Sequence, residues 1–207
     1  MTTERKVPKA TLQRYPVYLK ALRKLKADGE TKIMSRQLAD YVSIESTTIR
    51  RDFSFLGSLG KQGYGYNVDD LIKIFSDELG VNFDEKIVLI GAGNLGKALL
   101  NYNKWNHVVG EIVCAFDLMP DKVTGASVPV YALKDIREQL PQGWRIAILC
   151  ISQDVQNTVD LLVDSGIKGF VSFAVDHFSV PQGVYVKQVD VVSSIQELVF
   201  ETNSMKD

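Results

Sequence analysis

Residues 86–102 read Lys86-Ile-Val-Leu-Ile-Gly-Ala-Gly-Asn-Leu-Gly-Lys-Ala-Leu-Leu-Asn-Tyr102 and carry the clearest structural signal in the chain. Lys86–Ile90 is a short apolar run, which is typical of a buried parallel strand. The turn Gly91-Ala-Gly-Asn-Leu-Gly96 follows directly, and Lys97–Tyr102 has helical character. A GxGxxG pattern is common by chance, but a strand before it and a helix after it are the context that a dinucleotide-binding turn requires.

Each glycine of this turn has an expected role. Gly91 permits the tight turn, Gly93 lets the backbone approach a pyrophosphate, and Gly96 lets the helix pack closely on the sheet. The helix start stabilises the negative charge of the pyrophosphate. A second strand ends at Asp117, about twenty residues after Gly96, where an acid is expected to hold a ribose 2′-hydroxyl and repel a 2′-phosphate. The sequence therefore predicts an NAD(H) site formed by Gly91, Ala92, Gly93, Asn94, Leu95, Gly96 and Asp117.

The remaining residues of this half alternate between strand and helix patterns. Helices are expected at 132–140 and 154–165, and strands at 111–117, 144–151, 169–173 and 183–189. This α/β alternation predicts a mostly parallel, doubly wound sheet with helices on both faces. Ligands bind outside the carboxyl ends of such strands, which adds further residues to the expected cofactor site: Ile151, Ser152, Phe173 and Ala174.

Composition excludes several classes of protein. The 207 residues are 45% hydrophobic and 24% charged, as in ordinary soluble globular proteins. No apolar run approaches the ~18 residues of a membrane-spanning helix, and the first residues lack the pattern of a secretory signal. The two cysteines, Cys114 and Cys150, have no disulfide-scaffold or metal-ligand spacing and favour buried core positions, with a redox thiol at Cys150 as the alternative. We therefore expect a cytoplasmic protein without a metal site.

Charge is distributed unevenly along the chain. Residues 1–66 hold thirteen Lys and Arg against six Asp and Glu, whereas residues 67–207 hold eleven against nineteen. A compact basic segment joined to an acidic remainder indicates a module that faces nucleic acid. Chance variation in surface charge is the alternative.

The basic segment has the pattern of three short helices. Apolar residues from Leu12 to Leu25 recur at helical spacing, with Pro16 either in the first turn or at a kink. Ser35 and Ser46 are expected to cap the next two helices, 36–42 and 47–56. Two short helices joined by a tight connection predict a helix-turn-helix, whose second helix enters the major groove of DNA. Hydroxyl and arginine side chains are expected on its outer face: Thr47, Thr48, Arg50, Arg51 and Ser54.

A glycine-rich stretch, 57–67, follows the helix-turn-helix. Glycines and aromatic residues alternate around Lys61 and Gln62, which favours a hairpin of the kind that forms the wing of a winged helix. Lys61 at its tip would contact phosphates or a narrow minor groove, whereas a plain structural hairpin is the alternative. A linking helix then begins at the N-cap Asn67 and ends at Gly80.

The last residues place apolar side chains on one helical stripe over 191–205. Such a helix either folds back on its own domain or docks on a second subunit. The domain boundaries are accordingly expected at 1–80 for the DNA-binding domain, 81–190 for the dinucleotide-binding domain and 191–207 for a dimerisation helix.

An enzyme is the rival interpretation. A dehydrogenase needs a proton donor or acceptor near the nicotinamide and a substrate domain, but the nucleotide fold occupies the chain after residue 84. His177 follows a strand end and is the one candidate acid or base near the site. A binding protein is favoured, with a small NAD(H)-dependent oxidoreductase or a regulator of another nucleotide as alternatives.

Several motifs resemble one known family. They are Val7-Pro-Lys-Ala-Thr11, Arg50-Arg-Asp-Phe-Ser-Phe55, Gly60-Lys-Gln-Gly-Tyr-Gly-Tyr66, the turn from Gly91 to Tyr102, and Ala115-Phe-Asp117. Together, in this order, they resemble the Rex redox-sensing transcriptional repressors. The resemblance implies a cytoplasmic homodimer with a winged helix, a Rossmann domain and a C-terminal helix exchanged between subunits. It also implies operator binding when NADH is scarce and release when NADH binds.

The resemblance also suggests roles for individual residues. It places Lys20, Tyr102 and Asp190 at the nicotinamide and the switch, and it fills out the DNA-binding set to Lys9, Thr11, Ser46, Thr47, Thr48, Arg50, Arg51, Ser54, Lys61, Gln62 and Tyr64. The chain departs from the family pattern where arginine is usual, at Lys20 and Gln62, and where proline is usual, at Gln153 and Val175. A nicotinamide pocket of Ile151, Phe173, Ala174 and the partner subunit's Val191 would disfavour the positive ring of NAD⁺ by desolvation.

Overall fold

The computed structural model describes residues 7–57, 59, 64–80, 85–102 and 109–204. The chain divides into two compact units, Met1–Asn82 and Phe83–Asp207. No helix in the described ranges is long and apolar enough to cross a membrane.

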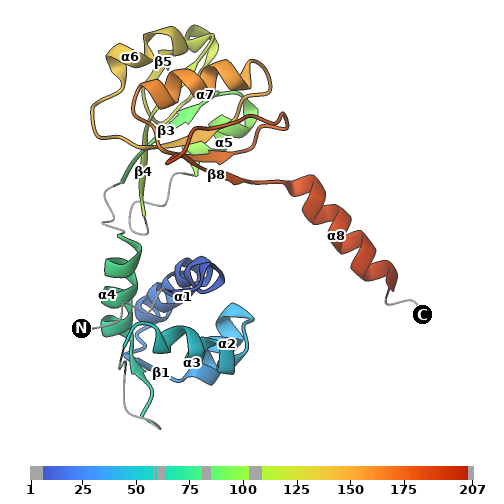
Figure 1. Cartoon of the computed structure of the whole chain (residues 1–207). Coiled ribbons are helices and arrows are strands. Elements are labelled where there is room, and N and C mark those ends of the chain that lie inside the picture. The colour runs from blue at the N-terminus through green and yellow to red at the C-terminus, as the bar shows by residue number, and fades with distance from the viewer. Residues whose placement is uncertain (1–6, 58, 60–63, 81–84, 103–108, 205–207) are drawn as a thin grey trace. The chain divides into compact units, whose positions relative to one another are not determined.

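The N-terminal unit is a helix-turn-helix with a small sheet (Figure 1). Helix α1 packs against α4, and α2 packs against α3. Phe53 of α3 packs among three aromatic rings of the core. The centroid of its ring lies 5.5 Å from that of Tyr18, 5.3 Å from that of Phe75 and 5.0 Å from that of Tyr66. The elements are α1 (Lys9–Ala27), β1 (Lys32–Ile33), α2 (Ser35–Val42), α3 (Ser46–Ser54), β2 (Tyr66–Asn67) and α4 (Val68–Leu79).

Helix starts differ from the sequence expectation. Ser35 and Ser46 are the first residues of their helices, so neither is an N-cap. Met34 takes the cap position of α2 because its N–H donates to the Gln37 side chain at 2.8 Å. The Ser46 hydroxyl instead accepts from the Arg50 guanidinium at 3.5 Å.

The N-cap expected for α4 is confirmed, because the Asn67 side chain accepts from the Asp70 N–H.

Two further features of this unit could not be settled from the sequence alone. Pro16 lies inside α1 and not in its first turn, which decides between the two expected positions, and the helix continues past it with Tyr15, Tyr18 and Leu19 buried on its inner face. The strand β2 pairs antiparallel with β1, a two-residue strand that the sequence analysis missed. The tip of the expected hairpin, with Lys61 and Gln62, lies outside the described residues.

The C-terminal unit is built on a six-stranded sheet in the order β5-β4-β3-β6-β7-β8, with every neighbouring pair parallel. This is the doubly wound order, in which the chain reverses direction across the sheet between β3 and β6. The main elements are β3 (Glu85–Ile90), α5 (Asn94–Asn101), β4 (Gly110–Asp117), β5 (Val130–Ala132), α6 (Ile136–Gln139), β6 (Ile146–Leu149), α7 (Val155–Asp164), β7 (Gly169–Ser172) and β8 (Tyr185–Gln188).

Helices cover both faces of this sheet. Along β3, Val88 and Ile90 pack in one core with residues of α7, whereas Ile87 and Leu89 pack in a second core with Leu100 of α5. This alternation explains the unbroken apolar run, because a strand covered on both faces needs apolar residues at every position. The predicted α/β architecture is therefore confirmed.

The chain ends in helix α8 (Val191–Ser204), drawn in red in Figure 1. None of its described residues is buried, so in this chain the helix is not folded back on its own domain, which was one of the two alternatives. Asp190 directly precedes the helix: its Oδ1 accepts from the Ser193 N–H at 2.9 Å and its Oδ2 accepts from the Ser193 hydroxyl at 2.6 Å. These hydrogen bonds lower the pKa of Asp190.

Candidate functional site

The glycine turn lies at the point where the sheet reverses direction. Gly91 has a φ of +90°, and a Cβ there would come within 2.7 Å of both the Cys150 carbonyl oxygen and Ile151 Cγ2. A Cβ on Gly96 would lie 2.0 Å from the Gly91 carbonyl oxygen. Gly93 has an ordinary φ, and a Cβ added to it would meet nothing within 4 Å. Two glycines thus serve close packing, and Gly93 leaves open space where a ligand can approach the backbone.

Asp117 lies directly beside this turn. Its Oδ2 accepts from the Ala92 N–H at 2.8 Å, and its Oδ1 accepts from the Met119 N–H at 2.8 Å. The end of β4 and the turn after β3 are therefore joined through one carboxylate. Because a carboxylate has about four lone-pair sites, each of its oxygens can accept one more hydrogen bond, for example from a hydroxyl group. Asn94 and Leu95 are exposed at the start of α5, next to the open side of Gly93.

A largely apolar cavity of about 630 Å³ lies at the carboxyl ends of β7 and β8. Its volume falls within the range of small-molecule sites. Phe173 and Ala174 line it as expected, together with Leu95 from the glycine turn. The lining also includes Val175, Asp176, His177, Phe178, Val186, Gln188, Val189, Asp190, Val191 and Val192.

The lining of this cavity differs from the expected nicotinamide pocket. Ile151 and Ser152 are not among the residues that line it, and Ile151 lies beside Gly91. This chain's own Val191 lines the cavity, and a contribution from a partner's Val191 stays a prediction. Gln188, a lining residue not identified from the sequence, donates its side-chain amide to the Ala174 carbonyl at 2.6 Å and holds the end of β7 against β8.

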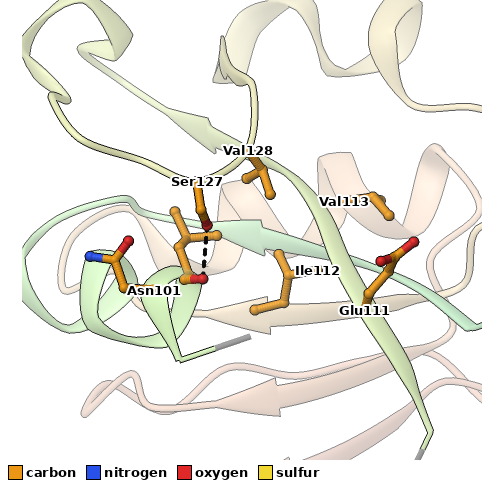
Figure 2. A pocket seen from close by; sticks show the side chains of 7 residues that line it. Asn101, Glu111, Ile112, Val113, Ser127 and Val128 are labelled. Carbon is orange, nitrogen blue, oxygen red and sulfur yellow. Dashed lines mark hydrogen bonds between the residues drawn. The ribbon is translucent and has the colours of Figure 1, made fainter. Parts of the chain in front are cut away.

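A second cavity, of about 430 Å³, lies beside the first half of β4 (Figure 2). Figure 2 shows the Ser127 hydroxyl donating to the Leu100 carbonyl at 2.9 Å. Glu111, Ile112 and Val113, at the start of β4, line it. Ligands of parallel sheets bind at the opposite, carboxyl ends of the strands, so this cavity is not part of the candidate dinucleotide site.

Both cysteines have the character of core residues. Burial raises the pKa of the Cys114 and Cys150 thiols to about 11. Both thiols are protonated near neutral pH, which disfavours nucleophilic or redox chemistry. Among the described residues, no three His, Cys, Asp or Glu side chains gather in a way that could hold a metal ion.

The candidate DNA-facing surface lies on α3. Thr47, Arg51 and Ser54 are exposed, whereas Ser46 and Thr48 are half-buried rather than fully outward. Arg50 is also exposed, and its guanidinium donates to the Ser35 hydroxyl at 3.2 Å, next to the start of α2.

Two further candidate DNA contacts lie outside α3. Lys9 is exposed at the start of α1, and Tyr64, which follows the undescribed hairpin tip, is 75% exposed.

Thr11 departs from its expected role. Its side chain is 2% exposed, and its hydroxyl donates to Asp52 Oδ1 at 3.0 Å. We therefore remove Thr11 from the DNA-contacting set, because its hydroxyl faces the interior. Asp52 and its partner Arg14 were not identified from the sequence alone. The signal was present, since Asp52 falls on the same helical stripe as the buried Ile49 and Phe53.

The three switch residues lie in different units. Lys20 is exposed on α1 of the N-terminal unit. Tyr102, 62% exposed, follows α5, and Asp190 precedes α8 in the C-terminal unit. Their joint role in switching stays a prediction.

The fold and site define a two-part protein, in which a DNA-binding helix-turn-helix unit is joined to a Rossmann-type nucleotide-binding unit. Redox-sensing transcriptional repressors Rex from Lactobacillus acidophilus and Anoxybacillus flavithermus are each 42% identical to this chain; the first match covers 98% of both chains, and the second covers 94% and 93%. The chain belongs to the Rex family of redox-sensing transcriptional repressors.

Family models and solved structures agree with this assignment. Residues 6–54 match the model "Putative DNA-binding protein N-terminus", and residues 82–175 match "CoA binding domain". A crystal structure of RSP in complex with β-NAD⁺ and operator DNA has a TM-score of 0.84 at 30% identity, covering 97% of this chain and 94% of that one. RSP in complex with β-NADH has a TM-score of 0.80 at 28% identity, covering 97% and 96%.

Proposed function

We propose that this chain represses transcription by binding operator DNA, and that NADH binding to its Rossmann-type unit releases it. The observation that carries the proposal is the open turn at Gly93, with Asp117 beside it, in a chain that also holds a helix-turn-helix. Relatives named as redox-sensing repressors, and an RSP structure with NAD⁺ and operator DNA, support it.

In this proposal the dinucleotide lies along the carboxyl ends of the strands. The pyrophosphate sits on the Gly91–Gly96 turn, and Asp117 accepts a ribose hydroxyl. The nicotinamide occupies the cavity formed by Phe173, Ala174 and their neighbours. The apolar lining disfavours the charged ring of NAD⁺, and the exposed Asp176 and Asp190 at its rim oppose that preference only weakly, since water screens them.

We also propose a homodimer joined through α8, because a helix with an exposed apolar stripe gains stability by burying it. A dimer presents two α3 helices to half-sites about one or more DNA turns apart, ~34–36 Å each. A repressor of this kind works where the DNA is, which is the cytoplasm in bacteria. We propose no enzymatic role, in keeping with relatives that are named as repressors.

The test is a titration of NADH with and without operator, using a duplex that the protein selects from random-sequence DNA. By linkage, operator should weaken NADH binding by the same factor by which NADH weakens operator binding. We expect a factor of about 5–150 in both directions. Equal NADH affinity with and without operator would refute the switch. Steady oxidation of NADH by a carbonyl compound would favour an oxidoreductase, and absence of any NADH thermal shift would favour another nucleotide.

Replacing Arg51 by Ala should weaken operator binding by about 5–150-fold, the effect of losing a bidentate contact to a base. Arg51 is exposed on α3 and belongs to a separate compact unit from the dinucleotide site, so NADH affinity should be unchanged. Lys73→Ala is the control, since it removes an exposed basic side chain from α4 of the same unit. Fluorescence anisotropy with the selected duplex measures both variants. Equal losses of operator affinity in the two variants would mean that the overall positive charge of the unit, and not a specific contact from α3, determines binding.

A further inference from the structure

Asp52 is an ionisable side chain of α3 with no access to solvent: its exposed fraction is 0%. Four hydrogen bonds from α1 saturate its carboxylate. Oδ1 accepts from the Thr11 hydroxyl at 3.0 Å and from Arg14 Nη2 at 2.7 Å. Oδ2 accepts from Arg14 Nε at 2.6 Å and from the Tyr18 hydroxyl at 2.6 Å. We call these four residues the α1–α3 clamp.

The charges within the clamp are well matched. Burial by itself raises the pKa of Asp52, but hydrogen bonds from Arg14, Tyr18 and Thr11 outweigh burial and leave that pKa lowered. The carboxylate is therefore ionised in the folded protein. The neighbouring carboxylate raises the pKa of Arg14, while burial is the main cause of the raised pKa of Tyr18. The group is an ion pair that is fully hydrogen-bonded.

Stability alone is a poor explanation for such a group. A buried ion pair gains little over apolar side chains of similar volume, because desolvation of the charges offsets their attraction. Hydrogen bonds differ from apolar contacts in being directional. Apolar packing at Ile49 and Phe53 holds α3 in the core but tolerates small rotations of the helix. Four directed bonds to one carboxylate tolerate much less.

The clamp also lies next to the residues proposed to meet DNA. Asp52 follows Arg51 directly, and the rotation of α3 about its axis sets the direction of the Arg51 side chain. Thr11, Arg14 and Tyr18 lie on the helix whose start carries the exposed Lys9. The two helices that carry candidate DNA contacts are thus fixed to each other through one buried carboxylate.

We propose that the α1–α3 clamp is a positioning device for sequence recognition, in which Asp52 sets the rotation of α3 so that Arg51 and its neighbours meet the base edges. The proposal rests on the operator-binding function proposed above. It gives Thr11, Arg14 and Tyr18 a role through Asp52 rather than through contact with DNA.

The experiment compares Tyr18→Phe with Tyr15→Phe in the full-length protein. Tyr18 and Tyr15 are both 0% exposed on α1, so neither can contact DNA. The Tyr18 hydroxyl donates to the Asp52 carboxylate, whereas the Tyr15 hydroxyl makes only a 3.5 Å contact with the Asp52 backbone carbonyl. The two variants therefore lose the same atom from the same helix, and only one of them weakens the clamp. Asp52→Asn is added as the stronger variant, because it removes the charge and keeps the shape.

The readout is the ratio of affinities for the selected duplex and for a scrambled duplex of equal length and composition, at one salt concentration. Non-specific affinity depends on phosphate neutralisation, which these variants leave unchanged, so a positioning defect lowers the ratio. Measurements well below each thermal midpoint confine the comparison to folded protein. We expect Tyr18→Phe to lower the ratio by about 10-fold or more, from the loss of one hydrogen bond to a charged group. Asp52→Asn should lower it further, and Tyr15→Phe should change it by less than about twofold.

An unchanged ratio in Tyr18→Phe would overturn the proposal, even if its thermal midpoint falls, since the clamp would then be a structural element only. An equal fall in both tyrosine variants would overturn it as well. If Asp52→Asn does not fold, Tyr18→Phe decides alone. A wild-type protein that selects no DNA would overturn the proposed function and this inference together, whereas wild-type binding with unaffected variants would remove only the inference.

Discussion

Gly93→Asp is expected to weaken NADH binding by at least about 100-fold, a loss of about 2.7 kcal/mol, and to leave the ligand-free protein as stable as the wild type. Gly93 is the N-cap of α5, has a φ of −67°, and would meet nothing within 4 Å of an added Cβ. Aspartate is among the preferred N-cap residues and its charge is favourable at a helix start, so α5 should form normally. The same charge would occupy the space proposed for the pyrophosphate and repel it.

Isothermal titration with NADH, together with thermal unfolding in its absence, separates these effects. Gln142→Asp is the control, since it adds the same charge to an exposed loop before β6, at the opposite ends of the strands. The Gly93 variant should still bind operator but should no longer be released by NADH. NADH affinity within about threefold of wild type would place the pyrophosphate elsewhere than on this turn.

The sequence was most informative for features that are set by a short turn and by neighbouring strands. The glycine turn was predictable because Gly91 and Gly96 are fixed by packing that no larger residue permits, and the 2.7 and 2.0 Å distances of their added Cβ atoms show that limit. The contact between Asp117 and the turn followed from the parallel order of β3 and β4. Both conclusions needed only neighbouring strands and a short turn.

Long-range contacts and short elements were less predictable. Asp52 meets Thr11 and Arg14 across about forty residues, which periodicity within either helix cannot reveal. The two-residue strand β1 is too short to show an alternating pattern, so the pairing partner of β2 was missed. The Ser35 cap failed for a local reason: Gln37 reaches back to the Met34 N–H, so the helix begins one residue earlier.

The role of Ile151 shows the same limitation in the site. Its position at the end of β6 suggested that it lines the nicotinamide pocket, and strand order alone cannot distinguish the two sides of that end. In the structure its Cγ2 packs beside Gly91, while Leu95 and Gln188 complete the cavity. The sequence therefore indicated the edge of the sheet at which the cavity lies, and side-chain packing determines which residues line that cavity.

Leu198→Asp should convert the proposed dimer to a monomer at micromolar concentration. Five apolar side chains of α8 lie on one stripe and are each at least 52% exposed in the single chain: Val191, Val192, Ile195, Leu198 and Val199. Burying them against a second copy removes apolar surface from water. An aspartate in the middle of that stripe would have to be buried without a partner, which costs several kcal/mol per ion. Sedimentation velocity measures the change, and the dimer dissociation constant should rise by at least about 100-fold.

Operator binding should fall together with dimerisation, because a monomer offers one α3 helix where the proposed operator has two half-sites, and the second contact is no longer intramolecular. Ser204→Asp is the matched control: it adds the same charge to the same helix, at an exposed position on the side away from the apolar stripe. That variant should stay dimeric and bind the duplex normally. A Leu198→Asp protein that remains dimeric would exclude the α8 stripe as the subunit contact, and a monomer with full operator affinity would exclude paired half-sites as the basis of recognition.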